Sequence, residues 1–244
     1  MCADVVRKGD CLMLPHVVIH NAISVDGGLD WLVPEWPHFN EFLGTYYGKV
    51  AVFEEDASLC GTETILKALE WGEDVVEDQP AEPFRPEPGD TRPLLVIPDS
   101  RGRVRIWRWL LRQPYWRAGV ALCSASTPQD YLEYMEGQGI DYVIAGDTHV
   151  DLEAALEEVN ARFGVRRMRV DSGGTLNGIL LRAGLVNEVS LMIAPVLAGG
   201  ESVVPFFRAP KLEGVEGLID MKLMHIERLD DDVLWVRYDV LNRR

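Results

Sequence analysis

The chain has 244 residues, of which 47% are hydrophobic, and its 24 Lys and Arg against 39 Asp and Glu give a net charge of −15. This length allows one large domain or two small ones. So acidic a surface repels phosphate backbones, which disfavours a nucleic-acid-binding protein. No apolar run is long enough to cross a membrane, and the first residues carry no signal peptide. Four cysteines without a C-x-x-C pair favour reduced thiols in the cytoplasm over a zinc site.

The first predicted element is a buried strand at residues 16–23, HVVIHNAI, which ends in the turn DGG at 26–28. Residues 31–42 are rich in Trp, Pro and His and have no clean period. We expect an irregular aromatic loop there, one that could cover a site. A short strand follows at either 50–53 or 57–60.

Helical periodicity then appears at residues 62–71, where Ile65, Leu66 and Leu69 share a face. Residues 72–92 are acidic and contain four prolines, so they favour an exposed insertion without a core of its own. Strand character resumes at residues 93–98, and we therefore expect an insertion within a single domain that spans 1–244.

Strands and helices alternate beyond this point. Asp151 is a good N-cap for the helix with the clearest apolar face. The predicted helices are residues 106–113, 128–137 and 152–163, and the predicted strands are 119–123 and 142–145.

The segment VDSGGTLNGILLRAGLVNEVSLMIAPVLAGG, residues 170–200, combines a strand end, a glycine turn, a helix over 176–183 and a strand over 189–193. Residues 222–241 read as two strands joined near 230–232. The alternation predicts an α/β fold with a central, mostly parallel sheet flanked by helices and an antiparallel hairpin at the C-terminal end.

Two glycine corners in this pattern are candidate ligand sites, because ligands of open α/β sheets lie beyond the carboxyl ends of strands. Gly173 and Gly174 would let a phosphate approach the start of a helix, where backbone N–H groups attract anions. Gly61 and Thr64 repeat the arrangement, so the two corners could hold the ends of a dinucleotide. A simple tight turn is the alternative for each, since the G-x-G-x-x-G fingerprint and the Walker A lysine are both absent.

Other candidates carry less information. The five histidines form no metal-ligand spacing, so no metal site is expected. Ser172 lies outside any G-x-S-x-G element, which disfavours a serine hydrolase. Asp26 follows a buried strand and could cap its turn, bind substrate or donate a proton.

Four ordered segments together resemble a known family. NAISVDGGLDW is similar to an A-x-S-x-D-G element, SLCGTETI to G-x-x-T, and RPLLVIPDSRGR to R-V-V-x-D-S. The segment at 170–200 is similar to V-E-G-G-x-T-L … L-L-x-x-G-L-V-D-E … A-P-x-x-x-G-G. These are elements of the riboflavin-biosynthesis reductases, which resemble dihydrofolate reductase in fold and occur alone or as the C-terminal half of a bifunctional deaminase–reductase.

The resemblance implies an NADPH-dependent reductase that opens the ribosylamino group of a pyrimidine 5′-phosphate by hydride transfer to C1′. It also implies a homodimer, and the zinc deaminase half is not recognisable in this sequence. It assigns Asp26 a catalytic role as an acid near the ring oxygen. The cofactor-binding residues that it implies are Ala22, Ser24, Thr64, Ser100, Gly173, Gly174, Thr175, Leu176 and Asn177. On the substrate side it implies Asp171, and Trp31 and Lys49 are further candidates that rest on no matching family position.

The sequence departs from the family on the substrate side. Asp171 and Ser172 replace Glu-Gly before the glycine turn, and Gly28 replaces a basic residue after S-x-D-G. The usual D-D-P-x-L-x-x-R after G-x-x-T is also missing, which leaves Lys49 as one possible phosphate contact. Two alternatives therefore stay open, namely a related NADPH reductase of another carbonyl, imine or pterin substrate, and a nucleotide-binding protein without turnover.

Overall fold

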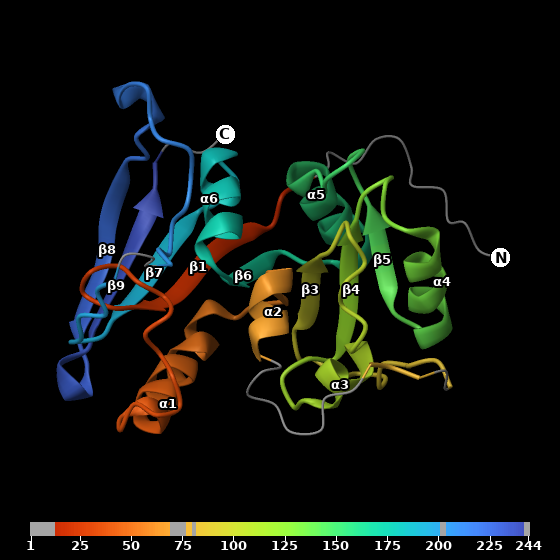
Figure 1. The fold of residues 1–244 in the computed structure, drawn as a ribbon, viewed down its shortest axis with the longest axis horizontal. Helices are drawn as coiled ribbons and strands as arrows, with labels where there is room; N and C mark the ends of the chain where they lie inside the picture. Colours follow the sequence, from red (N-terminus) through yellow and green to blue (C-terminus); the bar gives the residue numbers. More distant parts are fainter. Residues whose placement is uncertain (1–12, 69–76, 80–81, 201–203, 242–244) are drawn as a thin grey trace.

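The computed structural model describes residues 13–68, 77–79, 82–200 and 204–241. In this part of the chain nine strands form one sheet, in the order β5-β4-β3-β2-β6-β1-β7-β9-β8 (Figure 1). The strands are β1 (His16–Ile23), β2 (Ala57–Cys60), β3 (Leu94–Pro98), β4 (Ala118–Cys123), β5 (Asp141–Ile144), β6 (Arg167–Asp171), β7 (Glu188–Ile193), β8 (Met221–Arg228) and β9 (Leu234–Val240). The helices are α1 (Phe39–Val50), α2 (Thr62–Ala68), α3 (Trp107–Arg112), α4 (Gln129–Gln138), α5 (Leu152–Phe163) and α6 (Gly174–Arg182).

The sheet is parallel from β5 to β7 and antiparallel at its other end, where β9 pairs with β7 and β8. Strands such as β3 and β4 are continuous apolar runs, because a parallel strand is buried on both faces. The predicted fold class, a mostly parallel α/β sheet with a C-terminal hairpin, is confirmed.

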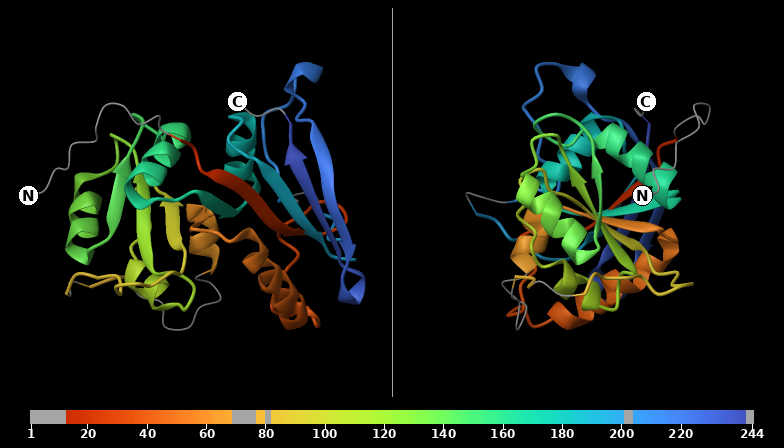
Figure 2. Two further views of the ribbon diagram at one scale, coloured as in Figure 1. Left: turned by 180° about the vertical axis from the view of Figure 1, so that it is seen from behind. Right: turned by 90° about the vertical axis from the view of Figure 1, so that its right-hand side faces the viewer.

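Helices cover both faces of this sheet. α5 and α6 pack on one face, and α1 and α3 lie on the other (Figures 1 and 2). Leu156 and Val159 of α5 are fully buried, which agrees with the apolar face predicted for that helix. Asp151 caps it as expected, accepting a hydrogen bond from the Ala154 N–H. No helix of the described residues is long and apolar enough to cross a membrane.

Two local predictions were wrong. The irregular loop expected at 31–42 ends earlier, because α1 begins at residue 39 and runs to 50. A 3₁₀ turn follows at 51–53, so the strand is at 57–60, the second of the two alternatives given for it. The buried face of α1 consists of Phe42 and Tyr46 alone, and two glycines interrupt its sequence, which hid its period. α6 also begins at residue 174 instead of 176, with Gly173 as its N-cap.

The proline-rich insertion has no regular structure in its described part, residues 77–79 and 82–92. The Asp78 carboxylate accepts hydrogen bonds from the Arg108 backbone N–H and the Tyr134 hydroxyl. The Phe84 N–H donates to the Gln138 carbonyl. These contacts attach the insertion to α3 and α4. The end of the predicted 62–71 helix lies outside the described residues.

α6 packs unusually closely against the segment that follows β7. A Cβ atom on Gly174 would lie 2.0 Å from the Pro205 carbonyl oxygen, and one on Gly178 would lie 1.9 Å from the Arg208 carbonyl oxygen. The Arg208 N–H also donates to the Gly174 carbonyl. Gly174 therefore serves backbone packing, and Gly173, whose Cβ position is open, is the glycine that faces free space.

This packing predicts opposite effects for two helical glycines. Gly178→Ala should lower the free energy of unfolding by about 1–3 kcal/mol, because the new methyl group meets backbone that must move. Gly44→Ala, in the middle of α1 with no atom near its Cβ position, should raise it by about 0.5–1 kcal/mol through helix propensity. Urea unfolding of both variants measures the difference. Equal stabilisation by the two substitutions would contradict the close packing.

Candidate functional site

A cleft of about 460 Å³ lies at the carboxyl ends of β2, β3 and β6, on the edge of the sheet where α2, α5 and α6 begin. This is the expected place for a ligand in an open α/β sheet. The two predicted glycine corners meet in this cleft. Six of the predicted cofactor residues line it: Thr64, Ser100, Gly173, Gly174, Thr175 and Leu176.

The start of α6 forms one wall of the cleft. Gly173 has extended backbone geometry and no atom within 4 Å of its Cβ position, so a ligand can approach it closely. The first N–H groups of an α-helix have no partner within the helix and attract anions. Thr175 lies in this first turn with its side chain exposed, and no side chain caps the helix. This wall therefore suits a phosphate.

The second corner, Gly61 to Thr64, forms the facing wall. The Thr62 hydroxyl donates to the Pro98 carbonyl, which ties the start of α2 to the end of β3. A Cβ on Gly61 would lie 2.5 Å from the Ser172 Oγ, so the end of β6 lies directly against this corner. The two corners are thus in direct contact, so a change in the position of one would move the other.

Asn177, predicted to bind cofactor, is fully buried beneath the first corner. Its amide nitrogen lies 2.8 Å from the Asn21 Oδ1, 3.3 Å from the Ser172 carbonyl and 2.8 Å from the Phe206 carbonyl. The Asn21 amide donates to the same Ser172 carbonyl. Asn177 thereby joins α6 to β1, to the end of β6 and to the segment after β7, and it supports the corner from below.

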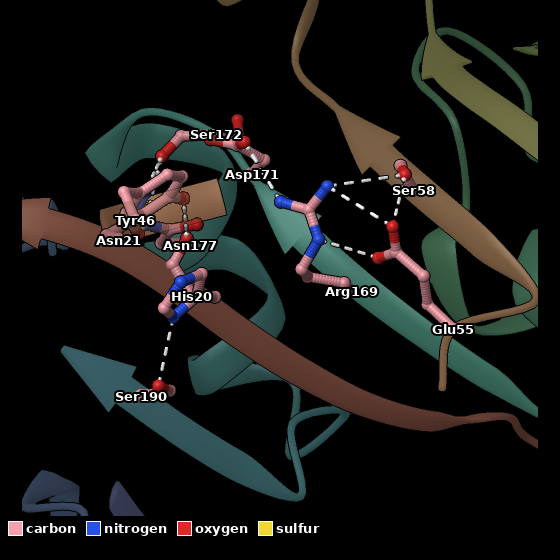
Figure 3. A network of polar contacts seen from close by, with 10 residues as sticks. All are labelled: His20, Asn21, Tyr46, Glu55, Ser58, Arg169, Asp171, Ser172, Asn177 and Ser190. Atoms are coloured by element: carbon pink, nitrogen blue, oxygen red, sulfur yellow. Dashed lines mark hydrogen bonds and ion pairs between the residues drawn. The ribbon is translucent and has the colours of Figure 1, made fainter. Parts of the chain in front are cut away.

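A charged cluster lies on the opposite face of β6, where Arg169 stands between Glu55 and Asp171 (Figure 3). The Arg169 guanidinium is 2.6 Å from the Glu55 carboxylate and 2.9 Å from the Asp171 carboxylate, and its side chain is only 6% exposed. Burial raises the pKa of Glu55 above its ordinary 4.5, and the Arg169 charge opposes that rise. Asp171 is the most exposed of the three, at the carboxyl end of the strand.

His20 is buried beside this cluster and is not a candidate acid or base. Its ring stacks on Tyr46, with centroids 4.5 Å apart, and shares a hydrogen bond with the Ser190 hydroxyl. Burial, with help from the Arg169 charge, lowers the pKa of His20 to about 3. His20 is therefore neutral at physiological pH and packs as part of the core under α1.

Asp26 is exposed and holds the turn after β1 to a distant segment. Its carboxylate accepts hydrogen bonds from the N–H groups of Ala198 and Gly199. Hydrogen bonds from the Ser24 hydroxyl, Gly199 and Ala198 lower the pKa of Asp26 to about 2. The carboxylate thus carries no proton at neutral pH in this structure, so its expected role as an acid stays a prediction that requires a bound ligand to raise this pKa.

The remaining predicted residues lie away from the cleft. Ala22 and Ser24 are at the carboxyl end of β1, and the Ser24 hydroxyl accepts the Gly28 N–H. Trp31 packs edge-on against the rings of Trp36 and Phe42. Lys49 lies in the last turn of α1. The Lys49 ammonium pairs with Glu227 and lies over the Trp235 ring.

The cleft is also lined by three side chains that were not predicted as site residues from the sequence: Lys67, His149 and Arg208. Lys67 is one turn beyond Thr64, and His149 precedes α5 just after β5, so the rule about strand carboxyl ends could have pointed to both. Arg208 reaches the cleft because its segment packs on α6, and no sequence pattern predicts this packing. The described residues contain no group of three His, Cys, Asp or Glu arranged to hold a metal ion.

The mostly parallel sheet and the glycine-lined cleft at its carboxyl edge are features of α/β proteins that bind nucleotides. Among these, the RibD C-terminal domain model matches residues 15–235. The chain belongs to this family, which confirms the resemblance drawn from the four motifs.

Individual relatives agree with this assignment. The chain is 27% identical over 224 residues to the 2,5-diamino-6-ribosylamino-4(3H)-pyrimidinone 5′-phosphate reductase of Aquifex aeolicus, covering 87% of this chain and 88% of that protein. It is 25% identical over 185 residues to the riboflavin biosynthesis protein RibD of Escherichia coli, covering 75% of this chain and 47% of that protein.

Solved structures support the fold. Acinetobacter baumannii RibD superposes with a TM-score of 0.64 at 18% identity, over 93% of this chain, which spans 58% of that chain. The riboflavin biosynthesis reductase Rib7 of Saccharomyces cerevisiae superposes with a TM-score of 0.59 at 17% identity, over 96% of this chain and 93% of that one.

The charged cluster generates a prediction about stability. Arg169→Met should lower the free energy of unfolding by about 3–5 kcal/mol, because it leaves the buried Glu55 carboxylate without its cation. Arg103→Met, which removes an exposed partner of Glu63, should cost less than about 1 kcal/mol. Denaturant unfolding of both variants makes the comparison.

The same Arg169→Met variant should respond to pH in a definite direction. Without the cation the pKa of Glu55 rises further, so the folded state holds a proton that the unfolded state releases. The loss of stability relative to the parent protein should therefore grow as pH rises above 4.5 and be smallest below it. A loss that is constant from pH 4 to pH 8 would contradict a buried ionised Glu55.

Proposed function

We propose that this protein is a reductase of riboflavin biosynthesis that uses NADPH to reduce a ribosylamino-pyrimidine 5′-phosphate. The observation that carries the proposal is the cleft in which both glycine corners meet, in a chain whose family includes named pyrimidinone phosphate reductases. When bound, NADPH supplies a hydride, and the acceptor is C1′ of the substrate's open imine form.

The cleft is suited to an anionic dinucleotide in an otherwise acidic protein. The N–H groups at the start of α6 and the Gly173 surface would hold the pyrophosphate, with Thr64 and Ser100 on the facing wall. Lys67 and Arg208 add local positive charge that favours the phosphates of NADPH, and His149 adds a ring that can form hydrogen bonds. The dinucleotide would thereby be held mainly by backbone groups that the fold already holds in place.

The substrate would then lie toward the carboxyl ends of β1 and β6, which are neighbours in the sheet. Ala22 and Ser24 at the end of β1 would contact the nicotinamide end, and Asp171 at the end of β6 would contact the substrate. Arg169 fixes one oxygen of the Asp171 carboxylate. Trp31 and Lys49, which belong to the α1 side, would be reached only by an extended substrate.

The test is an NADPH oxidation assay at 340 nm with two substrates, the 2,5-diamino-6-ribosylamino-4(3H)-pyrimidinone 5′-phosphate and its deaminated uracil counterpart. We expect turnover of at least one, and a loss of about 10²-fold or more in kcat in Asp171→Asn if its charge acts on the transition state. Thr91→Ala, an exposed hydroxyl before β3, is the matched control. Binding of NADPH without turnover of either compound would reject this substrate class, and a screen of carbonyl, imine and pterin compounds would then test the related reductase.

The functional unit that we propose is a homodimer formed through β8. This strand is at the edge of the sheet, and Leu223, Met224 and Ile226 expose about half or more of their surfaces on it. Open edge strands with apolar side chains associate unless they are covered. A second copy of β8 would cover this one symmetrically.

Sedimentation velocity tests the dimer with two matched substitutions. Ile226→Glu on β8 (61% exposed) should convert the dimer to monomer, because it places a charge in the interface. Ile144→Glu on β5, the opposite edge strand (51% exposed), should leave the dimer intact. A monomeric parent protein, or a dimer that persists in Ile226→Glu, would exclude β8 as the interface.

Two further properties belong to the proposal. The whole chain would be one reductase domain, since its described strands join in a single sheet. It would work in the cytoplasm, where Cys60 and Cys123, which are buried free thiols, stay reduced.

A further inference from the structure

The hydroxyl of Ser172 lines the cleft and makes no hydrogen bond within the described part of the chain. The residue is 4% exposed and stands between Asp171, the last residue of β6, and Gly173, the N-cap of α6. Its carbonyl accepts hydrogen bonds from Asn21 and Asn177, which fixes the backbone. Its hydroxyl makes no such bond, so it is free to donate to a ligand in the cleft.

The hydroxyl faces the cleft at the line where the two corners meet. Ser172 is one of the residues that line the cleft, and its Oγ lies against the Cα of Gly61, where a Cβ atom would approach it to 2.5 Å. Gly173, directly beside it, has open space in place of a side chain. A ligand that passes from the Gly173 surface toward β1 therefore crosses the Ser172 hydroxyl.

We propose that the Ser172 hydroxyl donates a hydrogen bond to the dinucleotide, at the phosphate on the nicotinamide side. The inference rests on the proposed NADPH site. A neutral donor suits this position because a phosphate oxygen accepts strongly and the N–H groups of α6 already supply positive potential. The nicotinamide-side phosphate is the one nearest to β1, to which Asn21 ties the Ser172 backbone.

Gly61 contributes to the position of the Ser172 hydroxyl. A side chain there would push the Ser172 hydroxyl away from the cleft, so the glycine keeps the donor in place. The V-E-G-G-x-T-L element that residues 170–176 resemble has glycine at the position of Ser172, so the hydroxyl would be a contact added by this chain.

The experiment compares the dissociation constants of three ligands for the full chain. NADPH and 2′-phospho-ADP-ribose contain the nicotinamide-side phosphate, whereas 2′,5′-ADP lacks it. Ser172→Ala should bind the first two about tenfold or more weakly than the parent protein, because it loses a hydrogen bond to a charged group. Its affinity for 2′,5′-ADP should be unchanged, and Thr91→Ala should bind all three as the parent does.

Equal affinity of Ser172→Ala and the parent for all three ligands would overturn the inference, as would an equal loss for all three. If the parent itself fails to bind NADPH, the proposed function fails and not this contact alone. Ser172→Gly supplies a second removal of the hydroxyl if the alanine variant folds poorly. The pair Gly61→Ala and Gly61→Ala with Ser172→Gly checks the geometry, since the second substitution should restore the thermal midpoint lost in the first.

Discussion

The buried amide of Asn177 is the interaction on which the cleft depends. It joins α6 to Asn21 of β1, to the end of β6 through the Ser172 carbonyl, and to the segment after β7 through the Phe206 carbonyl. A buried polar network of this kind restrains the segments that it joins, because a shift of any one of them breaks hydrogen bonds away from water. The close approach of Arg208 to Gly178 adds a steric limit on the same helix. The position of the Gly173 corner thus follows from contacts beneath it and not from the turn alone.

The charge of the chain explains why backbone groups would carry the binding in the proposed site. The chain has a net charge of −15, and its most buried cation, Arg169, is already committed to Glu55 and Asp171. An anionic ligand must therefore be attracted locally, by the helix start and by the few basic side chains of the cleft. The same commitment of Arg169 holds Asp171 at the end of β6, so in the proposed site a fixed carboxylate would face the substrate while N–H groups would hold the cofactor.

Sequence patterns predicted most of the sheet, because continuous apolar runs such as residues 94–97 have few alternatives to a buried parallel strand. They missed α1, whose aromatic residues and glycines give no helical period. The glycine corners were found by their place between strand and helix. The partners of those corners were not, because Asn21, Asn177 and Arg208 meet only through tertiary packing. Lys49 was one possible phosphate contact, and its ion pair with Glu227 of β8 depends on tertiary packing that local sequence does not encode.

A crystal structure of the protein with NADPH tests the central claim most directly. The account predicts that the pyrophosphate lies on the Gly173 corner between α6 and Thr64, with the adenosine end toward Ser100 and His149 and the nicotinamide at the carboxyl end of β1. Density for the dinucleotide on any other surface, or a pyrophosphate out of reach of the α6 N–H groups, would contradict it.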